Sequence, residues 1–423
     1  MRRATGVLFL GLAAASGIVW SEEKHQHGSR APIAPEFRVN TFTTGNQGSP
    51  SSAFRPNGFV AVWESDGQDG SGMGVFGRLG FGGAEFPVNT FATGDQHDPD
   101  VASNGTGDFV VVWTSPQDGS GDGVFAQRFA SSGAPVGPEF QVNTFTTGTQ
   151  YQPAVAADLS GDFVVVWSSL GQEGTGAEVF GQRFSSSGVR LGSEFRVNTF
   201  TTGDQYRPDI GSDSAGNFLV VWQDGAAPGS GGSAGRGVIG RSYGSTGAPV
   251  GPEFQVNTHT TGFHGAPAVA VNPAGGAVVV WHSDGQDGSD LGIFGQRYSV
   301  SGTPIASEFQ VNTFTTGRQA DPAVGMENTS LGCFVVAWSS DGEDGSGSGI
   351  FARTYPFGVN PMDVFPFNEF STGNQTRASV GALPEFDLLV LWDSEGQDGS
   401  GTSVYGRIDN HFVPVELMQF KVE

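Results

Sequence analysis

The sequence predicts an all-β protein, a seven-bladed β-propeller of four-stranded antiparallel blades whose ring is closed by a terminal strand. Three observations support this prediction. One sequence repeat occurs seven times, each copy contains a tryptophan, and each copy contains four short strand-like segments between glycine-rich turns. Repetition at a fixed period of this length is typical of arrays and propellers, which bury a core by stacking their units.

A tryptophan marks each copy of the repeat. Consecutive members of this series lie between 50 and 59 residues apart. A β-solenoid would need shorter coils, and a tandem of sandwich domains would need about 100 residues per unit. The period therefore favours a propeller with seven blades. The marker residues are Trp63, Trp113, Trp167, Trp222, Trp281, Trp338 and Trp392.

The third copy shows the four expected strands most clearly. They are PAVAAD at 153–158, DFVVVWSS at 162–169, VFGQRF at 179–184, and the EF-x-VN segment that follows. The second is an almost continuous apolar run, which suits a strand buried on both faces. The third and fourth alternate apolar and polar residues, as strands nearer the rim do. Glycine-rich and serine-rich stretches supply the turns.

The EF-x-VN segment occurs eight times, although a ring of seven blades needs it only seven times. The N-terminal copy fits the consensus better than the last one, so we expect it to pair into blade seven and close the ring. The clear copies begin at Glu36, Glu85, Glu139, Glu194, Glu253 and Glu308, and degenerate ones lie at 364–368 and 419–423.

Antiparallel pairing predicts which loops share a face of the ring. Neighbouring strands run in opposite directions, so alternate connections lie on the same side. The TTGxQ crossing into each blade and the DGQDGSG hairpin should therefore lie on one face. The LSGD and SSSGAPVG turns should lie on the other.

The N-terminal segment predicts export. Residues 1–20, MRRATGVLFLGLAAASGIVW, have the basic start, apolar run and small residues of a secretory signal peptide. An uncleaved anchor is the alternative, but the run is short for a membrane span. We expect 21–34 to be a flexible leader and 35–423 a single propeller domain. The chain should be extracellular, periplasmic or on the cell surface, with no membrane span after signal cleavage.

Composition limits the partners. The formal net charge is −23 at pH 7, which argues against nucleic acid, whose phosphates require Lys and Arg. The charge favours cations, or neutral or basic partners, and we expect a monomer. Cys333 is the single cysteine of the sequence, so no disulfide framework can form within one chain.

Acidic, glycine-rich hairpins follow the tryptophans. Calcium binding is one interpretation, because carboxylates and carbonyls are hard ligands and glycine permits a sharp turn. Structural turns are the other, because Asp accepts hydrogen bonds from its own loop. We favour turns, since Pro116 and Leu170 interrupt the first acidic position and two acids per loop fall short of an EF-hand. The candidate calcium ligands are Asp66, Asp69, Asp284, Asp287, Asp341, Asp344, Glu395 and Asp398.

One arginine recurs near the third strand of every blade. It stands two places after the bulky residue of that strand in four blades and three places after it in three blades. One step along a strand reverses the face that a side chain meets. We expect a bracing role, through a pair with the Glu of EF-x-VN or with an Asp of the hairpin. The set is Arg78, Arg128, Arg183, Arg241, Arg297, Arg353 and Arg407.

Most departures from the repeat gather around blades four and five. His259 replaces a recurring Phe, His264 replaces a recurring Gln, and His282 follows the fifth tryptophan of the series. The fourth hairpin, 223–237, is the longest and carries Arg236. All of these should lie on one face, where three imidazoles could bind a transition metal or act as acid and base. Drift of surface loops within a repeat is the alternative interpretation.

Familiar catalytic motifs are not evident in the sequence. There is no Ser–His–Asp spacing, no H-E-x-x-H, no P-loop, and no G-x-G-x-x-G after an expected strand. Paired carboxylates for glycoside chemistry stay open, because nothing sets one pair apart from the repeated loop acids.

The repeat resembles that of secreted bacterial β-propeller proteins over about 36–423. Its most specific parts are EFxVNTxTTGxQ and GDFVVVWxSxGQDGSG. VAADLSGDF partly resembles FG-GAP/VCBS repeats, but their D-x-D-x-D-G calcium ladder is missing. The S-x-D-G hairpin is similar to the Asp-box of sialidases, but without its spacing and terminal Trp. The resemblance implies the fold and export, and it implies no substrate.

Two hypotheses of function follow. The first is a secreted, non-catalytic propeller that acts as a binding, adhesion or scaffold module for a protein or carbohydrate. The alternative is a propeller carbohydrate-active enzyme, a polysaccharide lyase or a glycoside hydrolase, with its site on the blade-four and blade-five face near His259, His264, His282 and Arg236. No cofactor other than calcium is indicated.

Overall fold

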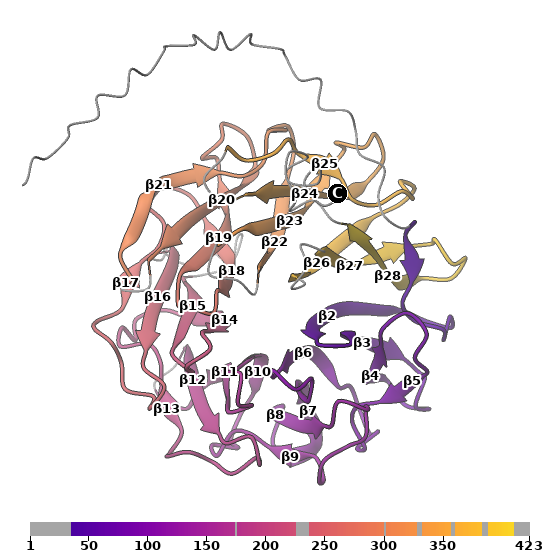
Figure 1. Cartoon of the computed structure of the whole chain (residues 1–423), viewed down its shortest axis with the longest axis vertical. Helices are drawn as coiled ribbons and strands as arrows, with labels where there is room; N and C mark the ends of the chain where they lie inside the picture. The colour runs from indigo at the N-terminus through magenta and orange to yellow at the C-terminus, as the bar shows by residue number, and fades with distance from the viewer. Residues whose placement is uncertain are drawn as a thin grey trace, which may run out of the picture. The chain divides into compact units, whose positions relative to one another are not determined.

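Seven four-stranded antiparallel sheets form the ring of a β-propeller in this computed structural model of the chain (Figure 1). The structure describes residues 35–173, 176–225, 237–299, 302–327, 332–356, 360–382 and 388–409. The predicted signal peptide and leader, Arg236, and the degenerate copy at 419–423 lie outside these residues. Among the described residues, no helix is long and apolar enough to cross a membrane.

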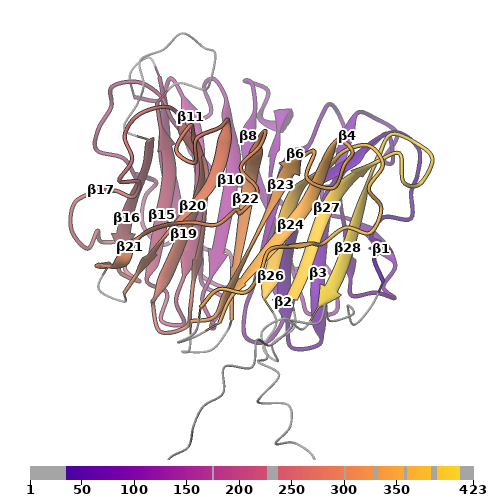
Figure 2. The same cartoon turned by 90° about the horizontal axis from the view of Figure 1, so that it is seen from above.

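Each blade follows the strand order that the third copy predicts, from the inner strand to the rim. Figure 2 shows these strands running between the two faces of the ring. Blade one is β2 (Gln47–Arg55), β3 (Gly58–Asp66), β4 (Met73–Leu79) and β5 (Glu85–Pro87). Blade two is β6 (His97–Ser103), β7 (Phe109–Ser115), β8 (Gly123–Phe129) and β9 (Phe140–Gln141), with a short 3-10 turn η1 (Pro116–Asp118) in its hairpin. Blade three is β10 (Gln150–Ala157), β11 (Phe163–Leu170), β12 (Ala177–Phe184) and β13 (Phe195–Arg196).

The remaining blades repeat this order. Blade four is β14 (Gln205–Ser212), β15 (Phe218–Asp224), β16 (Gly237–Tyr243) and β17 (Phe254–Gln255). Blade five is β18 (His264–Val271), β19 (Ala277–Asp284), β20 (Leu291–Tyr298) and β21 (Pro304–Gln310). Blade six is β22 (Gln319–Met326), β23 (Phe334–Asp341), β24 (Ser348–Tyr355) and β25 (Phe365–Pro366). Blade seven is β26 (Gln375–Ala382), β27 (Leu388–Glu395), β28 (Thr402–Asp409) and the N-terminal β1 (Phe37–Arg38).

The hydrophobic core lies between neighbouring blades. All seven marker tryptophans are fully buried on the second strands. Trp167 of blade three, for example, packs in one cluster with Val110 and Val112 of blade two. Every second strand is apolar on both faces because each face meets an adjacent sheet, as the run DFVVVW predicts.

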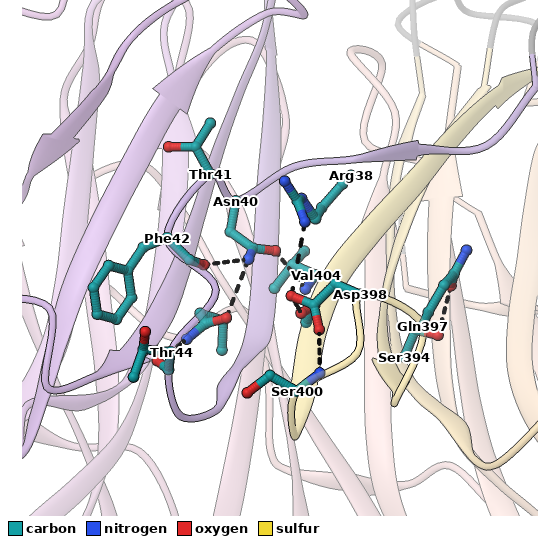
Figure 3. Close-up of polar contacts among 12 residues, drawn as sticks. Arg38, Asn40, Thr41, Phe42, Thr44, Ser394, Gln397, Asp398, Ser400 and Val404 are labelled. Atoms are coloured by element: carbon teal, nitrogen blue, oxygen red, sulfur yellow. Dashed lines mark hydrogen bonds and ion pairs between the residues drawn. The ribbon is translucent and has the colours of Figure 1, made fainter.

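The N-terminal strand closes the ring, as predicted. Phe37 and Arg38 of β1 pair with Gly406 and Tyr405 of β28. Beyond the strand, the Asn40 side chain accepts a 2.8 Å hydrogen bond from the Val404 backbone N–H and donates to the carbonyl of the crossing loop (Figure 3). These bonds join the two ends of the described chain without a covalent link.

The predicted division of loops between the two faces is confirmed. On one face, the hairpin and the crossing meet: the Asp66 N–H donates to the Asn46 carbonyl at 2.9 Å. On the other face, the two remaining turns meet: the Ser131 N–H donates to the Asp108 carboxylate at 2.8 Å.

The recurring arginines brace neighbouring blades, but their partners differ from the prediction. Arg78, Arg241, Arg353 and Arg407 donate to a backbone carbonyl beside the outer strand of the preceding blade, at 2.8 to 2.9 Å. Arg128 and Arg183 instead donate to a turn of the following blade. The one-residue shift thus reverses the direction of the brace, while the predicted carboxylate partner is wrong.

The EF-x-VN glutamates bind the crossing and the hairpin instead of the recurring arginines. Glu139 accepts hydrogen bonds from the Thr90 backbone N–H of the preceding blade, at 2.6 Å, and from Gln117 of its own hairpin, at 2.9 Å. The carboxylate is therefore used to tie the crossing and the hairpin together, which leaves the arginine to the backbone carbonyls.

Candidate functional site at the channel mouth

A central channel of about 850 Å³ runs between the inner strands of all seven blades. Its lining includes one residue from each blade at the same repeat position, near the start of the inner strand. We call these the mouth residues. They are Ser49, Asp98, Gln152, Arg207, Ala266, Asp321 and Arg377.

A β-bulge creates each mouth residue. The register of every inner strand shifts at this point, for example between Tyr206 and Asp209 of β14. Each mouth residue has a left-handed φ of 46° to 53°, which is uncommon for a side chain larger than glycine. Proline follows in six blades and Ala378 in the seventh. The backbone is thus the same in seven copies, whereas the side chain differs and faces the channel.

A side chain from the neighbouring blade supports several of these bulges. The residue after the marker tryptophan accepts a hydrogen bond from the backbone N–H of the next blade's mouth residue. Glu64 accepts from Asp98 at 2.7 Å, Ser168 accepts from Arg207 at 3.2 Å, and Gln223 accepts from Ala266 at 3.3 Å. Because strained backbone persists only where its surroundings hold it, these contacts fix the mouth residues in place.

Blades seven, one and two form an acidic side of the mouth. Glu64 and Asp393 occupy equivalent positions and are both buried. The Arg377 guanidinium lies 3.7 Å from the Asp393 carboxylate and 2.9 Å from the Ser49 hydroxyl. Burial raises the pKa of Asp393 to about 8, although Arg377 opposes the shift, and burial also raises the pKa of Glu64.

Asp98 and His97 extend the acidic side toward the solvent. The His97 Nδ1 lies 3.1 Å from an Asp98 carboxylate oxygen, and this hydrogen bond raises the pKa of His97. The Asp98 side chain is 40% exposed. Glu64 and Asp98 therefore place two carboxyl groups in different surroundings side by side, one buried and one in reach of water.

Blades four, five and six form a cationic side of the mouth. Arg207 and Arg318 line the channel from blades four and six and are exposed. His282 of β19 lies between them in sequence order and is buried. Burial lowers the pKa of His282 to about 4, and the charges of Arg207 and Arg318 act in the same direction.

Two aspartates lie deeper in the channel. Asp100 accepts hydrogen bonds from the Ser51 hydroxyl at 2.7 Å and from the Val155 N–H at 2.8 Å. Asp209 accepts from the Val269 N–H at 2.7 Å, and burial raises its pKa to about 7. Each carboxyl group thus links the inner strands of neighbouring blades.

The structure separates the three histidines that the sequence singles out. His259 and His264 lie together, with 5.5 Å between their ring centroids. His264 contacts the Ser283 hydroxyl at 2.9 Å. Successive residues of β19 project to opposite faces, so His282 lies on the other side of the strand from Ser283. Arg236, the fourth member, falls outside the described residues.

His264 takes the place of a structural glutamine. In the other blades a buried Gln at this position bonds the Asn of EF-x-VN, as Gln150 does with Asn143 at 2.9 Å. In blade five that Asn is Asn257, which donates to the His259 carbonyl. The repeat break at His264 therefore belongs to the interface between blades, whereas His282 is buried at the position of blade five that Glu64 occupies in blade one.

The acidic hairpins form hydrogen-bonded turns. In five hairpins the second acid accepts from a backbone N–H two residues on, as Asp69, Asp344 and Asp398 do at 3.0 Å from Ser71, Ser346 and Ser400 (Figure 3 shows Asp398). Asp287 does the same at 3.2 Å. Further bonds engage the first acids, and Ser348 donates to Asp341.

Metal binding at these hairpins stays a prediction. Within the described ranges, no group of three or more His, Cys, Asp or Glu side chains is arranged to hold a metal ion. Asp66, Asp284 and Glu395 each donate a backbone N–H to the adjacent crossing loop. This is the geometry that the turn interpretation requires, and chelation of the protein tests the calcium interpretation.

Sequence reasoning missed the mouth residues. Their signal was present as a variable residue before proline in six copies of Q-x-x-P or H-x-x-P. Strand periodicity cannot reveal that residue, because a bulge adds one residue and turns the chain. The acids Glu64 and Asp393 were visible as residues that follow tryptophan, but nothing local showed that they reach the next blade.

The comparisons with known proteins support the fold. No protein-family model and no curated protein matches the sequence. An ulvan lyase, from a new family of polysaccharide lyases and bound to -[GlcA(1-4)Rha3S]-, is similar in structure with a TM-score of 0.56. It is 10% identical over 92% of this chain and 100% of that chain. A second ulvan lyase structure gives a TM-score of 0.52 at 9% identity, over 93% of this chain and 99% of that chain.

An α-L-arabinanase of Penicillium chrysogenum in complex with arabinobiose is also similar, with a TM-score of 0.49 at 13% identity. The match covers 75% of this chain and 94% of that one. At these identities the likeness concerns the fold alone. The fold defines a seven-bladed β-propeller protein, and carbohydrate-active enzymes are among its structural neighbours.

Proposed function

We propose that this chain is a carbohydrate-active propeller enzyme that binds a glycan across the channel mouth and hydrolyses a glycosidic bond there. The observation that carries the proposal is the pair Glu64 and Asp98, two carboxyl groups in contrasting surroundings at the edge of a channel. The ulvan lyase neighbours support the class of protein, while the residues themselves support the chemistry.

The pair supplies an acid and a base. Burial raises the pKa of Glu64 and so favours its protonated form. Glu64 donates that proton to the glycosidic oxygen as the bond from the anomeric carbon to this oxygen breaks. A water molecule adds to the anomeric carbon, and its proton passes to the Asp98 carboxylate. Atoms balance with water as the only co-reactant.

Tyr151 and Tyr206 extend the proposed binding surface beside the mouth residues. Each stands one place before a mouth residue, and both are half-buried. An aromatic ring with a polar tip packs against a sugar face and also hydrogen-bonds to it, which is why tyrosine is frequent at interfaces. The charge of the exposed Arg207 guanidinium acts on the hydroxyl groups of both tyrosines.

A non-catalytic binding module is the second candidate, and one observation favours it. The Glu64 carboxylate supports the bulge of the next blade, as Ser168 and Gln223 do at the equivalent position. On this interpretation Glu64 holds the mouth in shape, and the glycan is bound without being cleaved.

Release of reducing ends from a panel of plant and algal polysaccharides tests the proposal. The wild-type chain should cleave at least one member, and Glu64→Gln should lose about 100-fold or more in rate, because a general acid contributes about 10²- to 10⁴-fold. Glutamine keeps the acceptor for the Asp98 N–H, so the variant should fold. Gln223→Glu, which places a carboxyl group at the equivalent position of blade four, is the matched control and should restore nothing to E64Q. Binding without cleavage would favour the module, and neither binding nor cleavage would overturn both.

Secretion is part of the proposal. The export segment predicted at residues 1–20 suits an enzyme whose polymeric substrate stays outside the cell. N-terminal sequencing of the protein from the culture medium or periplasm should show cleavage after the small residues that end the apolar run. A protein retained in the cytoplasm with its first residues intact would contradict this.

A further inference from the structure

Most arginines of this chain are committed to a partner. Six arginines of the recurring set brace backbone carbonyls and the seventh, Arg297, lies over the Phe334 ring. Arg38 pairs with Asp398, and Arg196 pairs with Glu173. Arg207 and Arg318 differ, because neither guanidinium has a hydrogen bond or ion pair within the part of the chain that the structure describes. Both are exposed and both line the central channel.

A buried side chain between these arginines is also without a partner. His282 is 3% exposed, and neither of its ring nitrogens has a hydrogen-bond partner among the described residues. Blade five carries His282 between blade four, which carries Arg207, and blade six, which carries Arg318. A buried polar group is normally hydrogen-bonded, so an unpaired imidazole in this position indicates a missing partner.

The charges of this side of the mouth favour an anion. Among the charged groups that act on His282, two are the guanidiniums of Arg207 and Arg318 and one is the carboxylate of Asp321, while His264 is the other titratable group. This excess of positive charge stands out in a chain of net charge −23. Because burial and both arginines keep His282 neutral, its imidazole offers one N–H donor to an anion without adding charge.

We infer that Arg207, His282 and Arg318 form a subsite for an anionic group of a sugar, either the carboxylate of a uronic acid or a sulfate ester. A guanidinium binds the two oxygens of either group in a forked arrangement, which a neutral hydroxyl cannot match. The sugar as carrier of the anion rests on the proposed function, whereas the anion subsite itself stands without it.

Two probes with a common neutral reference test the subsite. Sodium sulfate and glucuronate are titrated into the full chain with ¹³C-labelled histidine, with glucose as the neutral reference, and the His282 ring signals are followed against pH. A bound anion favours the imidazolium form, so the His282 titration should move to higher pH with sulfate, glucuronate or both. The probe that moves it identifies the anion as an ester sulfate or a carboxylate. Glucose should leave it unchanged.

The double variant Arg207→Gln/Arg318→Gln should weaken anion binding by about 10-fold or more, since charge-assisted bonds are the strong ones. The matched control is Arg38→Gln/Arg196→Gln, which removes the same charge from the outer strands β1 and β13 and should bind as the wild type does. Equal binding by R207Q/R318Q, or an unchanged His282 titration with both anions, would overturn the subsite.

Oligosaccharides separate this inference from the proposed function. If acidic oligosaccharides bind at least 10-fold more tightly than neutral ones of the same length, and R207Q/R318Q abolishes the difference, the inference holds. If neutral and acidic glycans bind equally, the subsite fails while the proposed function stands. If sulfate moves the His282 titration but no glycan binds, the subsite stands and the proposed function fails.

Discussion

The carboxylate of Glu64 in blade one accepts a 2.7 Å hydrogen bond from the backbone N–H of Asp98 in blade two. This contact joins the two residues whose carboxyl groups the proposed chemistry uses. It also holds Asp98 in a left-handed conformation, with φ at 51°. The acid of one blade therefore fixes the position of the base on the next, and the interface between blades becomes part of the site.

Asp393→Asn should change how stability depends on pH. Below pH 3.8 the carboxyl group is protonated in both states. Between 3.8 and the folded pKa of about 8, only the unfolded chain releases the proton, so the wild type loses stability as pH rises. Asparagine removes this loss, which amounts to at most about 6 kcal/mol at ~1.4 kcal/mol per pKa unit. Thermal melting of both proteins from pH 4 to 9 should show curves that separate as pH rises, with the variant more stable. Parallel curves would contradict the account.

His282→Gln should protect the protein against acid. The folded pKa of His282 is about 4 against an ordinary 6.5, so between these values the unfolded chain binds the extra proton. Stability is therefore lost as pH falls from 6.5 to 4, by up to about 3 kcal/mol. Glutamine already occupies this position in blade four as Gln223. Melting between pH 4 and 7 should show a shallower slope for H282Q, whereas His259→Gln, at a half-exposed position, serves as control. An unchanged slope in H282Q would mean that His282 is not held neutral by burial.

Asn40→Ala, at the closing strand, should destabilise the protein as strongly as Asn143→Ala, at the equivalent position between blades two and three. Asn40 and Asn143 make equivalent bonds, and each accepts a 2.8 Å hydrogen bond from a buried backbone N–H. Loss of that acceptor should cost about 1 to 3 kcal/mol in either variant. Denaturant unfolding of N40A and N143A checks this. A nearly neutral N40A beside a destabilised N143A would show that the N-terminal strand does not close the ring in solution.

Chelation should leave the acidic hairpins intact. Asp344 accepts the Ser346 N–H within its own turn, at 3.0 Å, and a Cβ on Gly349 would lie 2.7 Å from its other oxygen. The hairpin is thus closed by its own hydrogen bonds. Asp344→Ala should cost about 1 kcal/mol, and EDTA should not change the melting temperature of the wild type. If calcium raises the melting temperature of the wild type but not of D344A, the calcium interpretation is correct and the turn interpretation is not.

The fold was predictable because the same pattern of strands and turns recurs in seven copies of the repeat. Periodic tryptophans, four strand-like runs and the surplus EF-x-VN segment led to the blade count, the strand order, the shared faces and the closing strand. The partners of the arginines were not predictable, because a guanidinium satisfies a carbonyl as readily as a carboxylate. Arg78 reaches a carbonyl of the preceding blade, while Glu139 bonds a backbone N–H.

The candidate site at the channel mouth lies on the face that the sequence predicts, but it is built from other residues than the predicted histidine cluster. The sequence singled out histidines because they break the repeat, and strand alternation separates His264 from His282. The mouth residues include five residue types in seven copies, so no single copy stands out, and the bulge that turns them toward the channel leaves no periodic signal. Only the packing of neighbouring blades shows that Glu64 reaches Asp98.

The affinity of a bound glycan for channel-mouth and opposite-face variants tests the central claim most directly. Tyr151→Ala/Tyr206→Ala removes aromatic rings beside the mouth, and Leu159→Ala/Val250→Ala removes exposed apolar side chains from turns on the opposite face. Affinity is measured by calorimetric titration with the glycan that the wild type selects from an array. The first variant should lose about 10-fold or more in affinity, since stacking of a nucleic-acid base on an aromatic side chain is worth roughly 1 to 3 kcal/mol. The second variant should bind as the wild type does. Equal affinity for the mouth variant, or a loss confined to the opposite-face variant, would contradict a carbohydrate site at the channel mouth.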